Sequence, residues 1–399
     1  MPKGNARRSD GRVQSKIYLG NGKYKYVYAQ NQKELQKKIA EVKTKLGKGL
    51  DVSAERDTFG AWAERWLALK KGKISNGRYQ SYQYRVEKLS DLSNIPITKI
   101  NVADIQEIID KRCEIGDALK TLKEYKSVIS QIFEYAIINR VLDFNPTKGV
   151  ELPNTEETEQ RRALTDEEIS WITAPTEHRA HTAAMIMLYA GLRRGEVLAL
   201  TWNDIDLTNR TITVNKAVEM IDRKPIVKPR TKTKAGMRKV RIPSLLSEYL
   251  REQRDKATSL IVCPNSEGQL MSADSWRKLW DSYLKELNFK FGNFDNIIIQ
   301  DSKTGRIKQF EKPSSIFAPV KIPLVIPHIT AHWLRHTFVT MMYKAGVDIM
   351  TASKQAGHAD IKTTMEIYTH LDSEFKNNQM DKLDAYLGGN GCQMGVKTS

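Results

Sequence analysis

The 399-residue chain has few cysteines and no long apolar run. Its three cysteines, Cys113, Cys263 and Cys392, are odd in number and show no paired spacing, which excludes a cysteine-based zinc module and fits a reducing compartment. No apolar stretch approaches the roughly 20 residues that a membrane-spanning helix needs, and the first residues lack the apolar segment of a secretory signal. We therefore expect a cytoplasmic protein with no membrane partner.

The chain also has too few acidic residues to balance its basic ones. It contains 64 lysines and arginines against 47 aspartates and glutamates, which gives a formal charge of +17. An excess of this size indicates a polyanionic partner, and nucleic acid is the first candidate. The excess is concentrated in residues 1–50, where 13 basic and 3 acidic residues leave a net charge of +10.

The pattern of residues 1–50 predicts a small folded module. A strand over 13–19, a Gly-Asn-Gly turn at 20–22 and a second strand lead into a lysine-rich helix over about 32–46. Lysine alternates with tyrosine in the second strand, so we expect the tyrosines to pack on the helix while the lysines meet phosphates. A solvated basic hairpin is the alternative, but one-signed charge on a folded module favours DNA contact. The candidate contacts are Lys16, Lys23 and Lys25.

Residues 54–152 show the apolar periodicity of a helical bundle. Apolar residues recur at helical spacing after Thr58, after Asn101 and over 122–136, and we interpret these stripes as core. A basic connection follows the first stripe and is a second candidate surface for DNA. Its lysines are Lys70, Lys71 and Lys73.

A further domain is expected over residues 163–399. The preceding stretch, 153–162, is polar and non-periodic, as is typical of a linker. Thr165 and Glu168 then have the spacing of a capping box, which predicts that a new helix begins there.

Two segments of this domain place an arginine beside another functional group at helical spacing. Arg193 and Glu196 are three residues apart, a pair that alone would indicate only a surface ion pair. His332 and Arg335 also stand at i and i+3, so a proton-transfer group and a phosphate-binding group share one helix face. The two groups of the second pair can converge on one phosphodiester.

A zinc site is an alternative for the same helix. His332 and His336 stand at i and i+4, as histidine ligands of zinc do. However, Trp333 occupies the position at which the zinc-protease motif has glutamate, and the net charge suits DNA rather than a peptide. We therefore predict no metal and interpret His336 as a packed or supporting histidine.

A third segment contains Gly357-His358 and, ten residues after that histidine, Tyr368. Alone, Tyr368 would be interpreted as a helix-surface tyrosine. With the two arginine segments upstream, the order of motifs resembles that of the tyrosine recombinases, the phage-integrase family. Many relatives have nine residues where this chain has ten, which points to a slightly longer loop.

The resemblance implies a set of catalytic residues. The basic segment 227–242 is similar to the lysine-bearing β-hairpin of the family. We assign its catalytic lysine to Lys232, and Lys234 is the alternative for this role. Lys234 is also a further candidate DNA contact. Glu196 and His336 are expected to support the site. The six implied catalytic residues are Arg193, Lys232, His332, Arg335, His358 and Tyr368.

Such a set can exchange phosphodiesters without a cofactor. A tyrosine phenol, with a pKa of about 10, can both attack phosphorus and leave again. Arg193 and Arg335 can hold the non-bridging oxygens without metal or nucleotide. Lys232 is the expected acid for the departing 5′ oxygen and His332 the proton-transfer partner of the tyrosine, while the histidine of the third segment donates to the phosphate.

The resemblance also implies the architecture. We expect a mainly α protein with small β elements: an arm-type DNA-binding module over 1–50, a helical core-DNA-binding domain over 54–152 and an α+β catalytic domain over 163–399. The catalytic domain would carry a β-hairpin insertion at about 288–327. Residues 372–399 would form a helix and tail, with the helix docking on an adjacent subunit.

These inferences predict a bacterial, DNA-associated, site-specific recombinase that integrates and excises a mobile element, either a prophage or a conjugative transposon. Its expected partners are double-stranded DNA at core and arm attachment sites and three further copies of itself in a tetramer formed on DNA. An excision factor or a DNA-bending protein is a further candidate partner. A type IB topoisomerase and a non-catalytic DNA-binding regulator remain alternatives.

Overall fold

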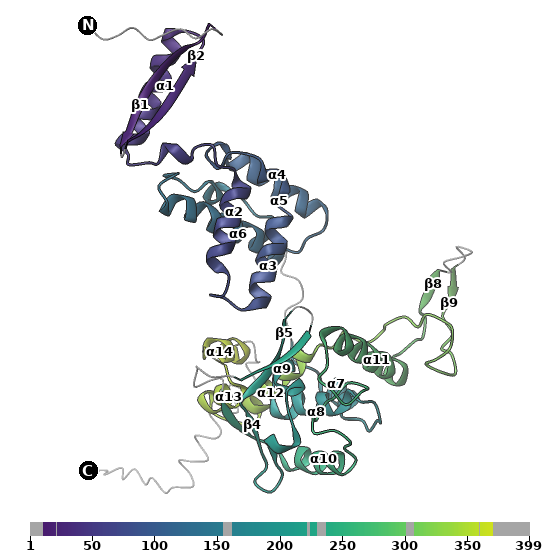
Figure 1. Ribbon diagram of the computed structural model, residues 1–399. Helices are drawn as coiled ribbons and strands as arrows, with labels where there is room; N and C mark the ends of the chain where they lie inside the picture. Colours follow the sequence, from purple (N-terminus) through teal and green to yellow (C-terminus); the bar gives the residue numbers. More distant parts are fainter. Residues whose placement is uncertain are drawn as a thin grey trace, which may run out of the picture. The chain divides into compact units, whose positions relative to one another are not determined.

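The computed structural model divides the chain into two compact units, Met1–Gln160 and Arg161–Ser399 (Figure 1). The boundary falls in the polar stretch that follows the helical bundle. Both units are mainly helical with small antiparallel sheets, which confirms the expected class. The structure describes residues 11–20, 22–154, 162–221, 224–229, 237–300, 307–358 and 360–369.

The first unit begins with the predicted hairpin and helix. Strands β1 (Val13–Gly20) and β2 (Lys23–Ala29) pair antiparallel, and helix α1 (Gln32–Gly47) packs on them. The side chain of Asn31 caps this helix by accepting a hydrogen bond of 2.9 Å from the Glu34 amide. The apolar side chains buried between hairpin and helix include Val13, Ile17, Val27, Leu35 and Val42.

The expected packing of the hairpin tyrosines on the helix is wrong. Tyr24 and Tyr26 are each 49% exposed, whereas Val27 and Ala29 of the same strand are buried. Successive strand residues face opposite sides, so burying these small apolar residues against the helix turns the tyrosines outward. Lys25 shares the inner face, where its ammonium group donates to the Val52 carbonyl at 3.0 Å and pairs with Glu55.

The rest of the first unit is a bundle of helices. The predicted stripes form its core, with Phe59, Trp66 and Ile109 among the buried side chains. Thr58 and Asn101 cap two of the helices through their side chains, as their positions before the stripes suggest. The helices are η1 (Val52–Ala54), α2 (Phe59–Lys70), α3 (Asn76–Glu87), α4 (Ser90–Ser93), η2 (Ile97–Lys99), α5 (Val102–Glu114), α6 (Leu119–Ile138) and η3 (Pro146–Gly149).

The second unit is built around α8 (His181–Ala190), an apolar helix that is buried on nearly every side. Helices α7 (Asp166–Thr173), α10 (Ser244–Asp255) and α12 (Ala331–Lys344) pack against it. The predicted capping box is present at the start of α7, where Thr165 and Glu168 bond each other's backbone amides. The remaining helices are α9 (Arg194–Leu198), η4 (Trp202–Asp204), α11 (Ala273–Phe291), α13 (Ile349–Ala356) and α14 (Lys362–Thr369).

Small antiparallel sheets complete the described part of this unit. A three-stranded sheet has the order β3-β4-β7, and β5 pairs with β6. The predicted insertion contributes the pair β8 and β9. Residues 301–306 between these strands, and the expected helix and tail at 372–399, lie outside the described residues. No helix in the described part of the chain is long and apolar enough to cross a membrane. The strands are β3 (Ile205–Asp206), β4 (Thr211–Val214), β5 (Lys216–Ile221), β6 (Lys224–Pro229), β7 (Arg238–Arg241), β8 (Ile298–Gln300) and β9 (Ile307–Gln309).

Candidate active site

The structure brings four of the six predicted catalytic residues into one region. Arg193 caps the start of α9, His332 and Arg335 lie in the first turns of α12, and His358 follows the end of α13. Tyr368 belongs to α14, although its side chain lies outside the described residues. Lys232 and Lys234 also lie outside them.

Arg193, His332 and Arg335 line a common cavity of about 770 Å³. Part of its lining comes from α11, where the rings of Trp276 and Trp280 stack with their centroids 5.1 Å apart. His332 reaches the surface, whereas Arg335 is only 3% exposed. Arg193 and Arg335 are both in the lining of the cavity, and a pair of guanidinium groups suits an anion such as a phosphodiester.

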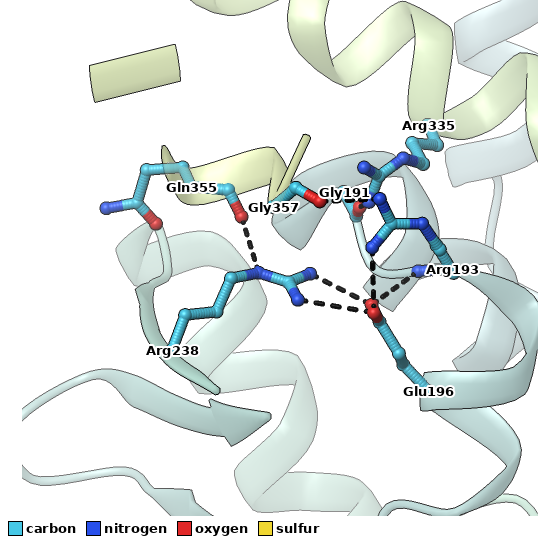
Figure 2. A network of polar contacts seen from close by, with 7 residues as sticks. All are labelled: Gly191, Arg193, Glu196, Arg238, Arg335, Gln355 and Gly357. Atoms are coloured by element: carbon cyan, nitrogen blue, oxygen red, sulfur yellow. Dashed lines mark hydrogen bonds and ion pairs between the residues drawn. The ribbon is translucent and has the colours of Figure 1, made fainter. Parts of the chain in front are cut away.

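Each of the two arginines is held by a glycine carbonyl of another motif (Figure 2). Arg335 Nη1 donates to the Gly191 carbonyl at 2.5 Å, and Arg193 Nη2 donates to the Gly357 carbonyl at 2.5 Å. Both glycines end a helix in the left-handed region, with φ values of 63° and 68°. A Cβ atom at Gly191 would lie 2.2 Å from the Phe338 ring, so a larger residue would have to displace this ring and adopt a strained backbone.

Glu196 holds Arg193 from a second side. Its Oε1 accepts from Arg193 Nη1 at 3.0 Å, and its Oε2 accepts from the Arg193 backbone amide at 2.9 Å. Glu196 is 1% exposed. Burial would raise the pKa of Glu196, but hydrogen bonds and charge from Arg238 and Arg193 outweigh burial and lower the pKa to about 2. The carboxylate is therefore charged at neutral pH.

Arg238, which the sequence reasoning missed, is the other partner of this carboxylate. Its Nη1 and Nη2 donate to the two Glu196 oxygens at 3.2 and 2.9 Å. Arg238 and Val240 lie two residues apart in β7, so they face the same side of the strand, and Val240 is fully buried. Alternation in the sequence does not show which side of this basic strand is buried, so Arg238 has no local signal there.

His358 is a neutral imidazole in this setting. Burial lowers its pKa first, and the nearby charges of Arg335 and Arg193 lower it further, to about 4. Its Nδ1 lies 2.7 Å from the hydroxyl of Thr364, which is fully buried. With this hydroxyl donating to Nδ1, Nε2 carries the ring proton and can donate to an anion.

The depressed pKa of His358 gives a pH dependence of stability. Between pH 6.5 and about 4 the unfolded chain binds a proton at this histidine and the folded chain does not, so stability falls as the pH is lowered through this window. We expect the His358→Gln variant to lose less stability than the native chain as the pH is lowered through this window. Urea unfolding at pH 7 and pH 5 measures it, and equal losses of stability in the two proteins would contradict the assignment.

No group of three histidine, cysteine or carboxylate side chains that could hold a metal occurs in the described part of the chain. His336, the second histidine of the alternative zinc site, is half-buried in α12. Its place in the helix, one residue after Arg335, is compatible with the packed or supporting role suggested by the sequence.

Comparison with protein families matches both units. Residues 157–374 match the model described as the phage integrase family, and residues 59–151 match the phage integrase central domain. The chain belongs to the phage integrase family. It is thus a tyrosine recombinase, an enzyme of site-specific DNA recombination.

Relatives of this integrase match along most of their length. A XerC-like tyrosine recombinase of Caldanaerobacter subterraneus subsp. tengcongensis is 27% identical, over 91% of this chain and 93% of the relative. The transposase from transposon Tn916 of Enterococcus faecalis is 24% identical, over 96% of this chain and 94% of the relative. Both alignments extend through most of each protein, so the similarity is not restricted to the catalytic motifs.

Solved structures of integrases share the fold. The Tn1549 transposon integrase in complex with a circular intermediate DNA aligns with a TM-score of 0.66 and 19% identity, covering 82% of this chain and 99% of that one. A lambda integrase tetramer bound to a Holliday junction aligns with a TM-score of 0.53 and 16% identity, covering 94% and 98%. The fold described above is therefore that of known integrases.

Proposed function

We propose that this integrase inserts and excises a mobile element by forming a 3′-phosphotyrosine bond at Tyr368, with neither metal nor ATP. The observation that carries the proposal is the pair of arginines, Arg193 and Arg335, that line one cavity with His332 and are each held by a carbonyl of a different motif. Two fixed cations that line one cavity supply the positive charge that a metal ion supplies elsewhere.

The steps follow from the side chains available. The phenol oxygen of Tyr368 attacks the scissile phosphorus, and the 5′ oxygen of the next nucleotide departs. Arg193 and Arg335 stabilise the charge that builds on the non-bridging oxygens. Lys232 delivers a proton to the departing oxygen, and His332, which is exposed at the cavity, takes the proton of the phenol.

The remaining site residues hold the phosphate and the catalytic side chains in position. His358, neutral and bonded to Thr364, donates from Nε2 to a phosphate oxygen. Glu196 holds Arg193 in place. His336 supports α12 beside Arg335. These three roles need no change of charge during the reaction, which suits groups that act by position.

Two surfaces of the first unit are proposed to bind DNA. The outer face of the hairpin carries Tyr18, Tyr24 and Tyr26, with the Lys16 ammonium 3.7 Å from the centre of the Tyr24 ring, and would bind arm-type sites. Lys23 lies beside this face at the turn, whereas Lys25 is left out because it pairs with Glu55. The bundle would bind core-type sites through Lys70, Lys71 and Lys73, and Lys234 of the catalytic unit would contact the same DNA.

The assembly is proposed to be a homotetramer formed on DNA, with residues 372–399 of each subunit docked on its neighbour. Support comes from the lambda integrase, which shares the fold and has been solved as a tetramer on a Holliday junction. Excision is proposed to need an excision factor or a DNA-bending protein, because arm and core sites that are far apart on DNA must be brought together.

Recombination of the element's own ends tests the function. A plasmid carrying both ends should yield joined ends and a closed circle in EDTA, and a plasmid without these ends should stay supercoiled. Relaxation of both plasmids to the same extent would favour a topoisomerase-like enzyme. Binding to the ends with no joined product, even when a DNA-bending protein and cell extract are supplied, would favour a non-catalytic regulator.

A further inference from the structure

Arg238 is a buried cation beside the active site to which neither the sequence motifs nor the proposed chemistry gives a role. It begins β7, six residues after Lys232 in the chain. Its side chain is 7% exposed, whereas that of Arg193 is 35% exposed. Arg193 and Arg335 line the cavity, whereas the guanidinium of Arg238 is directed at Glu196 and at the Gln355 carbonyl.

The guanidinium of Arg238 uses all three of its nitrogens (Figure 2). Nη1 and Nη2 donate to the two oxygens of Glu196, and Nε donates to the Gln355 carbonyl in α13 at 2.9 Å. One side chain from β7 thus connects α9 with α13. These are the two segments whose groups hold Arg193.

Arg238 contacts both of the groups that anchor Arg193 through hydrogen bonds. The first anchor is the Glu196 carboxylate, which Arg193 and Arg238 share. The second is the Gly357 carbonyl, and a Cβ atom added at Gly357 would lie 2.7 Å from the Arg238 guanidinium. The backbone of Gly357 is therefore packed directly on Arg238, so a shift of this guanidinium would move both groups that orient Arg193.

We propose that Arg238 is a positioning residue for strand cleavage, which acts by holding Glu196 and Gly357 where they orient Arg193 toward the scissile phosphate. The inference rests on the proposed phosphotyrosine chemistry. Lysine cannot replace Arg238. The planar guanidinium bonds both carboxylate oxygens and the Gln355 carbonyl at once, and a single ammonium group cannot reach all three acceptors.

The test compares variants of the full-length chain on a nicked DNA substrate that traps the covalent adduct. Arg238→Lys keeps a positive charge beside Glu196, so the fold should persist, and thermal unfolding checks this. At saturating DNA we expect adduct formation to slow by about 100-fold, the scale set by misplacing a catalytic group by about 1 Å. DNA affinity should stay within about twofold of the native chain, because the buried side chain makes no DNA contact.

Two further comparisons separate positioning of Arg193 from a general structural role. Arg241→Lys changes an exposed arginine of the same strand and should cleave at the native rate. In an Arg193→Lys background, Arg238→Lys should slow cleavage little further, because the group that it positions is already altered. A native rate for Arg238→Lys, or the same slowing in both backgrounds, would overturn the inference. Failure of the native chain to form any adduct would instead overturn the proposed function.

Discussion

Glu196→Gln is expected to lower the free energy of unfolding by about 3–5 kcal/mol, the usual cost of removing one partner from a buried ion pair. Glu196 is 1% exposed and is the shared acceptor of two guanidinium groups. Glutamine has the same shape, but it carries no charge and presents an amide NH₂ to one of the arginines. Arg238, at 7% exposure, would then be left as a buried cation without its counter-charge.

Urea unfolding followed by tryptophan fluorescence measures this effect. The matched control is Glu219→Gln, because Glu219 pairs with Lys228 at 2.9 Å on the surface of the same unit, with both side chains more than 40% exposed. We expect at most about 1 kcal/mol there. Equal losses in the two variants would show that the buried network is not an important contributor to stability.

The pH dependence of the Glu196 effect has a definite sign. The pKa of Glu196 in the fold is about 2, below its ordinary 4.5, so its contribution is complete above pH 4.5 and is lost as the pH falls toward 2. The difference in stability between the native chain and Glu196→Gln should therefore shrink in this window. A difference that stayed constant would mean that the carboxylate charge is not the stabilising feature.

Local patterns predicted most elements of the fold because they depend on neighbouring residues. Helix caps such as Asn31 and Thr165, and the apolar stripes of the bundle, need only the chain around them. The face of β2 that turns inward could not be predicted in this way. Alternation divides the strand into two faces, but which one is buried depends on the helix opposite, and the small Val27 and Ala29 occupy that interface instead of the tyrosines.

The same limit applies to the site. Motifs identified Arg193, His332, Arg335 and His358, which the structure gathers around one region. They did not identify Arg238, because its partners are 42 residues before it and 117 residues after it in the chain. A contact between such distant residues has no local signature, and in a run of basic residues an inward arginine looks like one that faces solvent.

Tyr368→Phe is expected to abolish covalent attachment to DNA while leaving DNA affinity unchanged. The variant removes one hydroxyl, and with it the only atom proposed to bond to phosphorus. The cations proposed to bind DNA remain, since Arg193 and Arg335 are held by carbonyls that do not involve this side chain.

Trapping of a protein–DNA adduct with DNA from the ends of the element, in EDTA and without ATP, is the most direct measurement. The reaction is quenched with detergent, and the native chain is compared with Tyr368→Phe on intact and nicked substrates. We predict an adduct with the native chain alone, mapped by mass spectrometry to Tyr368. Tight binding without an adduct on nicked DNA, or an adduct that persists in Tyr368→Phe, would contradict the proposed mechanism.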